Sequence, residues 1–218
     1  MTQDNSPIKQ RLQITFGKFD ELIYTSNLDL AKIWERVLRR AELPILYSEG
    51  FNPRPRIQLA SALPLGISSE CEILDVALRE PISLDGLAQR ILEKSPTGLR
   101  VFDIREVPIR AQALQALIRS AEYRIHFEDP LDRAALAEKV QALLNADTLE
   151  RERERKGSMV KFNLRPLVHD LYVDEAGDLI AHLSIGEQGN LRPDEILQEL
   201  GLGDLVVSIH RLRIHFAG

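Results

Sequence analysis

The chain alternates between strand-like and helix-like segments in an order that occurs twice. Leu12, Ile14 and Phe16 are separated by polar residues, which is the period of a half-buried strand. Ser26 or Asn27 is a suitable N-cap for a helix extending to about residue 41, whose apolar residues share one face. Pro44 bars any continuation of that helix.

Three further elements complete the first half. Strand-like runs at 57–63 and 70–78 are joined by Pro-Leu-Gly, a turn signal. Ser83 is expected to cap a second helix, and a strand is predicted over 99–107. The order β-α-β-β-α-β is that of the split βαβ, or ferredoxin-like, arrangement.

The same order begins again after a short helix that follows Pro108. Strands are predicted at 123–127, 148–155, 160–173, 179–185 and 206–216, and helices are predicted to open at Pro130 and Pro193. The sequence thus predicts an α+β fold of two ferredoxin-like halves in tandem with antiparallel sheets. The expected divisions are a flexible tail at 1–11, a first half at 12–108, a linking helix at 109–120 and a second half at 121–218.

Composition favours a soluble globular protein, because 44% of the 218 residues are hydrophobic and 28% are charged. No long apolar run exists and the first ten residues lack the apolar core of a signal peptide. The expected location is therefore the cytoplasm, without membrane contact. Cys71 is the single cysteine, which rules out an internal disulfide and any cysteine-rich zinc or iron–sulfur site built from this chain alone.

The net charge of −5 is not that of a typical nucleic-acid-binding domain, but two segments are locally basic. Between residues 36 and 56, five arginines stand against two glutamates. Between residues 150 and 165, six basic residues stand against three glutamates. Each segment has a local charge of +3, so either could contact a polyanion.

The first basic segment contains a loop, residues 48–56, with two X-Pro-Arg steps. Each proline restricts its own φ and the residue before it, so Arg54 and Arg56 are presented from a stiffened backbone. Their forked guanidinium donors suit a phosphate. The alternative is a rigid helix-to-strand connection with solvated arginines.

In the second basic segment, strand alternation would place the three glutamates on one face and three arginines on the other. Such a face could follow a nucleic-acid backbone. The residues concerned are Arg151, Arg153 and Arg155, with Arg165 extending the track. The alternative is an edge ribbon whose charges prevent aggregation.

Signals for catalysis are few. No phosphate-binding glycine loop or nucleophile elbow is present, and Glu49 and Asp75 are the acid/base candidates. For Asp75, a hydrogen-bonded strand aspartate is the alternative. The histidines lack metal-motif spacing, so neither a metal nor a cofactor is predicted. They are His126, His169, His182, His210 and His215.

Residues 47–56, Tyr-Ser-Glu-Gly-Phe-Asn-Pro-Arg-Pro-Arg, followed by 62–72, Ala-Leu-Pro-Leu-Gly-Ile-Ser-Ser-Glu-Cys-Glu, resemble the signature of a bacterial family of unknown function. Its members are fused to radical-SAM proteins or encoded beside them. The residues that carry the loop motif are Ser48, Gly50, Phe51, Asn52 and Pro53. A radical-SAM cluster needs a Cys-x-x-x-Cys-x-x-Cys motif, so the resemblance implies that this chain is the partner in trans.

A fainter resemblance, over 97–108 and 123–125, is to the tRNA pseudouridine synthases built from two ferredoxin-like halves. That family carries its catalytic aspartate in an Arg-Thr-Asp-Ala-Gly loop. The comparable residues 49–53 contain no aspartate. The resemblance therefore implies lost uridine isomerisation, while an RNA-binding cleft could remain.

These observations lead to one main hypothesis and two alternatives. The main hypothesis is a non-catalytic module that presents structured RNA, either tRNA or rRNA, to a radical-SAM modification enzyme. One alternative is an enzyme with its site between the halves, using Glu49 or Asp75 as acid/base and Arg54 as an anion clamp. The other is a domain that docks on the radical-SAM partner without touching RNA.

Overall fold

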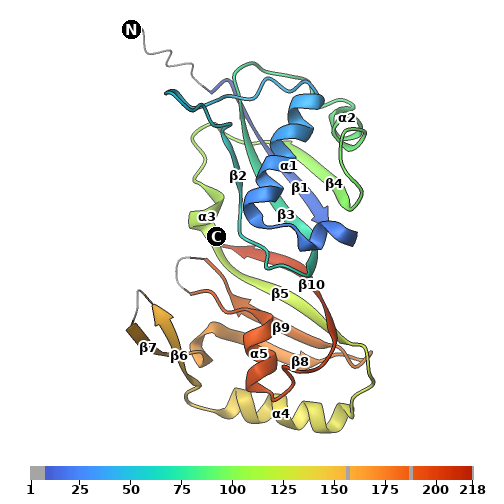
Figure 1. The fold of residues 1–218 in the computed structure, drawn as a ribbon, viewed down its shortest axis with the longest axis vertical. Helices are drawn as coiled ribbons and strands as arrows, with labels where there is room; N and C mark the ends of the chain where they lie inside the picture. Colours follow the sequence, from blue (N-terminus) through green and yellow to red (C-terminus); the bar gives the residue numbers. More distant parts are fainter. Residues whose placement is uncertain (1–7, 156–157, 187–188, 218) are drawn as a thin grey trace. The chain divides into compact units, whose positions relative to one another are not determined.

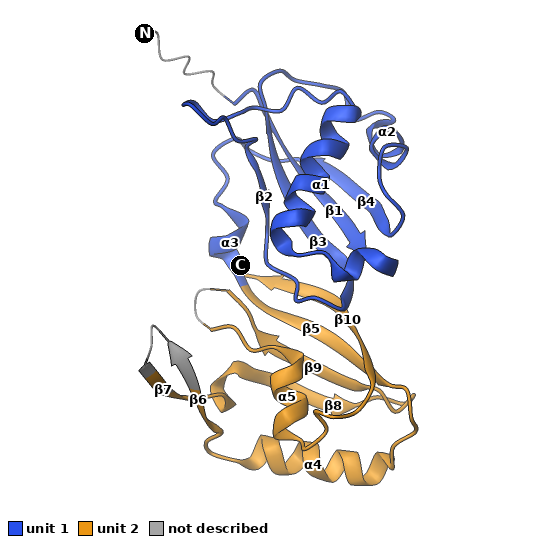
Figure 2. Ribbon diagram, viewed as in Figure 1, with its two compact units in different colours: residues 1–118 blue, residues 119–218 orange. Residues whose placement is uncertain are grey.

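The computed structural model describes residues 8–155, 158–186 and 189–217, and it divides into two compact units (Figure 2). Unit 1 comprises residues 1–118 and unit 2 residues 119–218. Each unit combines a sheet with helices, which confirms the α+β class (Figure 1). Among the helices of the described ranges, none has the length and apolar character needed to cross a bilayer.

Unit 1 has a four-stranded sheet in the order β4-β1-β3-β2. All three neighbouring pairs are antiparallel. Its elements are β1 (Gln10–Lys18), η1 (Asp20–Tyr24), α1 (Asn27–Arg40), β2 (Ile57–Leu59), β3 (Ile67–Leu78), α2 (Leu87–Leu92), β4 (Leu99–Glu106) and α3 (Leu114–Leu117).

The core of unit 1 lies between α1, α2 and one face of this sheet. Alternate residues of β1, beginning with Leu12, are fully buried on that face, as the sequence pattern predicts. The Ser26 hydroxyl caps α1 by accepting a hydrogen bond from the Asp29 N–H at 3.1 Å. Helix α1 then places Trp34 against Phe16 of β1, with ring centroids 4.9 Å apart.

Unit 2 has a sheet in the order β10-β5-β9-β8 and a separate antiparallel ribbon, β6-β7. The ribbon is inserted between α4 and β8 in the chain. The elements are β5 (Ile118–Phe127), α4 (Arg133–Asn145), β6 (Glu150–Arg155), β7 (Ser158–Asn163), η2 (Arg165–Leu167), β8 (Val168–Val173), β9 (Leu179–Ser184), α5 (Pro193–Glu199) and β10 (Val207–Phe216).

The two faces of the unit 2 sheet differ in chemistry. Ala121 and Tyr123 of β5 are buried. Their register partners on β9, Leu183 and Ala181, are buried on the same face. Successive strand residues point to opposite faces, so the residues between them form the other face. Those residues are Ser120 and Glu122 on β5 and His182 and Ser184 on β9.

Several expected element boundaries are wrong, most clearly those at Ser83, Pro130 and 160–173. Ser83 accepts a hydrogen bond from Asp85 N–H and does not cap a helix, and α2 begins only at Leu87. Pro130 does not open α4, because Asp132 caps that helix by accepting from two backbone N–H groups. The single strand expected at 160–173 is two strands, β7 and β8, separated by η2, where Pro166 lacks an N–H for a strand ladder.

Candidate functional site

Residues 47–56, here called the Arg-Pro loop, have a stem built like a strand ladder. Tyr47 pairs with Pro55, and the Ser48 N–H donates to the Arg54 carbonyl at 2.8 Å. The Arg56 N–H donates to the Leu46 carbonyl at 2.7 Å, and the Arg56 carbonyl accepts from a β3 N–H at 3.0 Å. The stem is thereby fixed to the β3 side of the unit 1 sheet.

The tip of the Arg-Pro loop is open to solvent. Gly50 has φ +121°, a conformation that glycine adopts without strain. Phe51 is 106% exposed, so its ring packs against nothing that would keep it from water. Glu49 is exposed as well, and it forms no hydrogen bond or ion pair with any described residue. A carboxylate placed in this way lacks the desolvated, oriented setting of a general acid or base.

The two arginines of the loop are exposed donors. The backbone at 54–56 is extended, and successive side chains of an extended segment point to opposite sides. The side chains of Arg54 and Arg56 therefore lie on the side opposite the Pro55 ring. Neither forms an ion pair with a carboxylate in the described part of the chain. Arg56 also lines an open hollow of about 340 Å³, together with Arg11 and Asp75.

Asp75 on β3 is held in a buried ion pair. Its two carboxylate oxygens accept from Nε and Nη2 of Arg11, each at 2.8 Å, and both side chains are about one-tenth exposed. The hydrogen bond to Asp75 raises the pKa of Arg11. Arg11 also donates to the backbone carbonyls of Ile109 and Ala111. The geometry therefore favours the hydrogen-bonded strand aspartate over an acid/base role for Asp75.

The second basic segment is partly occupied by contacts within unit 2. Arg151 on β6 forms an ion pair with Glu199 of α5. The Arg165 guanidinium donates to the Leu144 carbonyl at 3.0 and 3.1 Å and to the Val168 carbonyl at 3.0 Å. The side chains of Arg153 and Arg155 lie outside the described part of the structure. Both arginines whose side chains are described thus have partners already.

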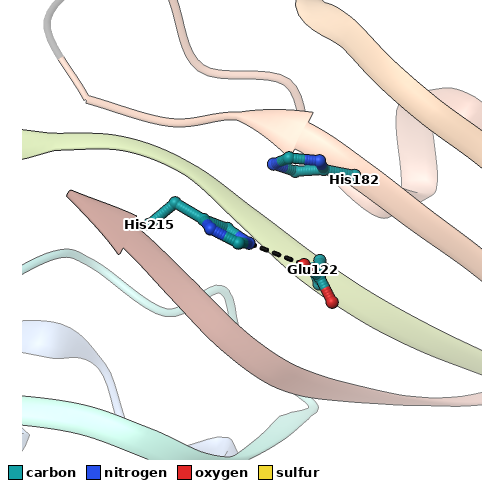
Figure 3. Close-up of side chains that lie close together, drawn as sticks. All are labelled: Glu122, His182 and His215. Atoms are coloured by element: carbon teal, nitrogen blue, oxygen red, sulfur yellow. Dashed lines mark hydrogen bonds and ion pairs between the residues drawn. The ribbon is translucent and has the colours of Figure 1, made fainter. Parts of the chain in front are cut away.

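A cluster that the sequence did not predict lies on the polar face of the unit 2 sheet. Glu122 on β5 is directly opposite His182 on β9. The His215 side chain, from β10, lies close to both. Figure 3 shows the three side chains converging from three strands, with His215 Nε2 2.6 Å from a Glu122 oxygen. One ligand-type atom from each residue lies within 4.8 Å of the other two.

Neighbouring side chains hold this cluster in place. The His182 ring lies between those of His169 and His215, at centroid distances of 4.8 and 4.6 Å. His182 Nε2 is 2.7 Å from the Ser120 hydroxyl, and His169 Nε2 is 2.8 Å from the Ser184 hydroxyl. Burial lowers the pKa of His182, and the adjacent histidines lower it further, against the opposite effect of Glu122. The His182 imidazole is therefore biased toward its neutral form.

No metal-motif spacing marks this cluster in the sequence, because its members come from strands far apart in the chain. Only the pairing of β5 with β9 and β10 brings them together. The available signal was polar residues at every second position of the strands, such as Ser120 and Glu122 on β5. His126 lies elsewhere, 2.7 Å from an Asp178 oxygen.

Comparison with known proteins identifies a family and finds distant structural likenesses. A family model described as "Uncharacterized protein conserved in bacteria (DUF2344)" matches residues 11–193. No curated protein sequence matches the chain significantly.

Among solved structures, the chain is similar to a chain of "Crystal Structure of a Cbf5-Nop10-Gar1 Complex", with 11% identity and a TM-score of 0.47. The match covers 93% of this chain and 48% of that one, so the chain spans about half the length of its structural relative. The family model spans most of the chain, which confirms the bacterial family expected from the loop motif. The protein belongs to the bacterial DUF2344 family.

Proposed function

We propose that the protein is a non-catalytic adaptor whose Arg-Pro loop binds structured RNA for a radical-SAM enzyme acting in trans. One observation carries this proposal: Phe51, Arg54 and Arg56 are exposed together on a loop whose stem is fixed by backbone hydrogen bonds. An exposed aromatic ring can stack on an unpaired base, and forked guanidinium donors suit phosphate oxygens. A fixed stem reduces the entropy lost when these groups are held against RNA.

The distribution of charge supports the loop as the contact. Unit 1 contains 15 Lys and Arg against 15 Asp and Glu, whereas unit 2 contains 13 against 18. The net charge of −5 therefore belongs to unit 2. A polyanion meets less repulsion at unit 1, where the loop has a local excess of positive charge.

The acid/base candidates support binding over catalysis. Glu49 is at the solvent-exposed tip, and the Asp75 oxygens are engaged by Arg11. We also propose that the two units are ferredoxin-like halves in tandem. The sheet orders β4-β1-β3-β2 and β10-β5-β9-β8 support this, because the corresponding strands occupy the same positions in both.

RNA binding is tested by fluorescence anisotropy with a labelled tRNA transcript and a labelled rRNA hairpin at several salt concentrations. Arg54→Ala/Arg56→Ala is expected to weaken binding by roughly tenfold and to reduce the salt slope by about 2. The matched control is Arg90→Ala/Lys94→Ala, which removes the same charge from exposed positions of unit 1 and should bind like wild type. Binding that is undetectable, independent of salt, or equally weakened in the control would overturn the proposal.

The radical-SAM part of the proposal is supported by the loop motif and by the single cysteine, Cys71. It is tested by co-purifying the chain with a radical-SAM protein of the same organism, with and without nuclease. An adaptor should carry RNA into the complex, and nuclease should release that RNA. A complex that withstands nuclease and high salt, formed by a chain that binds no RNA, would instead identify a protein-docking domain.

A further inference from the structure

We propose that Glu122, His182 and His215 form a binding site for a divalent transition-metal ion of the Zn²⁺ type on the sheet of unit 2 (Figure 3). The donor set is two imidazole nitrogens and one carboxylate oxygen. This combination suits Zn²⁺ and its first-row neighbours, whereas Mg²⁺ and Ca²⁺ prefer oxygen ligands alone.

The distances are close to those that a metal requires. In a tetrahedral site with bonds of about 2.1 Å, neighbouring donor atoms are separated by about 3.4 Å. The three donor atoms lie within 4.8 Å of one another, and the Glu122–His215 pair is at 2.6 Å. Small side-chain rotations, without backbone movement, would bring all three onto one ion.

The backbone and the neighbouring side chains already orient the ligands. Glu122 and His182 are register partners in the β5–β9 pair, which fixes the separation of their Cβ atoms. Ser120 holds the His182 ring through its hydroxyl, and His169 covers the far face of that ring. Such hydrogen-bonded support is what aligns metal-binding histidines.

The site is also accessible. Side-chain exposure is 33% for His215 and 28% for Glu122, so an ion can enter while losing part of its hydration. Three protein ligands leave a coordination position for water or an external ligand, as in zinc sites of the open type. The proposed metal site lies in unit 2 and does not include the Arg-Pro loop. Chelating agents should therefore leave the RNA affinity that depends on the loop unchanged.

The test uses the full chain without an affinity tag, stripped with a chelating agent and titrated with Zn²⁺ by calorimetry and with Co²⁺ by absorbance. Wild type should bind one metal ion per chain. The Co²⁺ complex should show the visible absorption bands that are typical of Co²⁺ with a low coordination number. His182→Ala, His215→Ala and Glu122→Gln should each weaken binding by more than the roughly 10- to 100-fold typical of losing a supporting partner.

The matched control is His126→Ala, which removes an imidazole paired with a carboxylate, Asp178, away from the cluster. This variant should bind Zn²⁺ like wild type. If its affinity falls as far as that of His215→Ala, or if wild type binds no stoichiometric ion, the site does not exist.

A second measurement avoids dependence on the folding of the variants. Imidazole NMR of wild type should show Zn²⁺ shifting the signals of His182 and His215 and leaving those of His126 unchanged. Zn²⁺ should also raise the thermal unfolding temperature of wild type, because it binds the folded state preferentially. Shifts confined to His126, or no change in unfolding temperature at saturating Zn²⁺, would overturn the proposal.

Discussion

The basic segment at 36–56, which ends in the Arg-Pro loop, and the basic segment at 150–165 have the same local charge of +3, but the arginines of the loop and those of the second segment have different surroundings. Arg54 and Arg56 are exposed and have no carboxylate partner among the described residues. Arg151 is paired with Glu199, and the Arg165 guanidinium donates to the backbone carbonyls of Leu144 and Val168. Two segments with the same net charge therefore differ in how many guanidinium groups are available to bind an anion.

The difference shows why a charge count along the sequence overestimates binding sites. Glu199 is 48 residues from Arg151 in the chain, and α5 brings it to the ribbon. An arginine engaged in this way would lose its existing partner when it contacted a phosphate, which offsets the gain. Arg54 and Arg56 avoid this loss because neither has a carboxylate partner among the described residues to give up.

The largest expected effect distinguishes a structural arginine from a surface one. Arg165→Ala should lower the free energy of unfolding by about 2–3 kcal/mol, because charged hydrogen bonds to the carbonyls of Leu144 and Val168 are lost. Arg54→Ala should change it by less than about 0.5 kcal/mol. Urea unfolding measures both values. Equal losses in the two variants would mean that Arg165 stabilises the fold no more than the exposed Arg54 does.

A smaller effect is expected on RNA binding when the aromatic tip is removed. Phe51→Ala should lower RNA affinity by about 5- to 160-fold, since stacking contributes about 1–3 kcal/mol per base. The fold should not be affected, because Phe51 is fully exposed. Tyr24→Ala is the control, as this aromatic residue of η1 is also exposed, at 71%. Similar losses in both variants, measured by anisotropy, would mean that the loop has no special role.

The elements that the sequence predicted well are those determined by local interactions. The alternation of Leu12, Ile14 and Phe16 is sufficient for β1, and the Ser26 hydroxyl determines where α1 begins. The start predicted for α4, with Pro130 in the first turn, is wrong because the Asp132 carboxylate accepts from two N–H groups and caps the helix later in the chain. Such competition between neighbouring start signals is not resolved by propensity alone.

The sites show the same division. The stiffness of the Arg-Pro loop is encoded locally by Pro53 and Pro55. The Glu122–His182–His215 cluster was missed because it depends on the order of strands in a sheet. The engagement of Arg151 was also missed, since it depends on where α5 packs. Non-local pairing of this kind leaves no periodic signal in one sequence.

The paired arginine gives a further, smaller prediction. Arg151→Ala should lower the free energy of unfolding by less than about 1 kcal/mol, because the ion pair with Glu199 is partly exposed. RNA affinity should remain within about twofold of wild type if that arginine is already occupied. Should Arg151→Ala weaken RNA binding as much as Arg54→Ala does, the contrast between the two basic segments would fail.

The smallest effect concerns pH and the stem of the Arg-Pro loop. Burial raises the pKa of Tyr47, and the negative charge of Glu35 adds to this while Arg39 opposes it. Since the folded-state pKa is raised, the stabilisation is complete below the unfolded value of about 10 and is lost as pH rises above it. Tyr47→Phe should therefore show a shallower alkaline decline in the urea midpoint than wild type.

Tyr172→Phe is the control for this measurement, because Tyr172 is a 49% exposed tyrosine of unit 2. Its alkaline decline should follow that of wild type. Absorbance at the phenolate band should also show that the late-ionising component of the folded protein is smaller in Tyr47→Phe than in wild type, because the pKa of Tyr47 is raised. A Tyr47→Phe decline parallel to wild type would mean that burial and the charge of Glu35 do not stabilise the neutral form of Tyr47, and that the stem of the loop is more open to water than the structure shows.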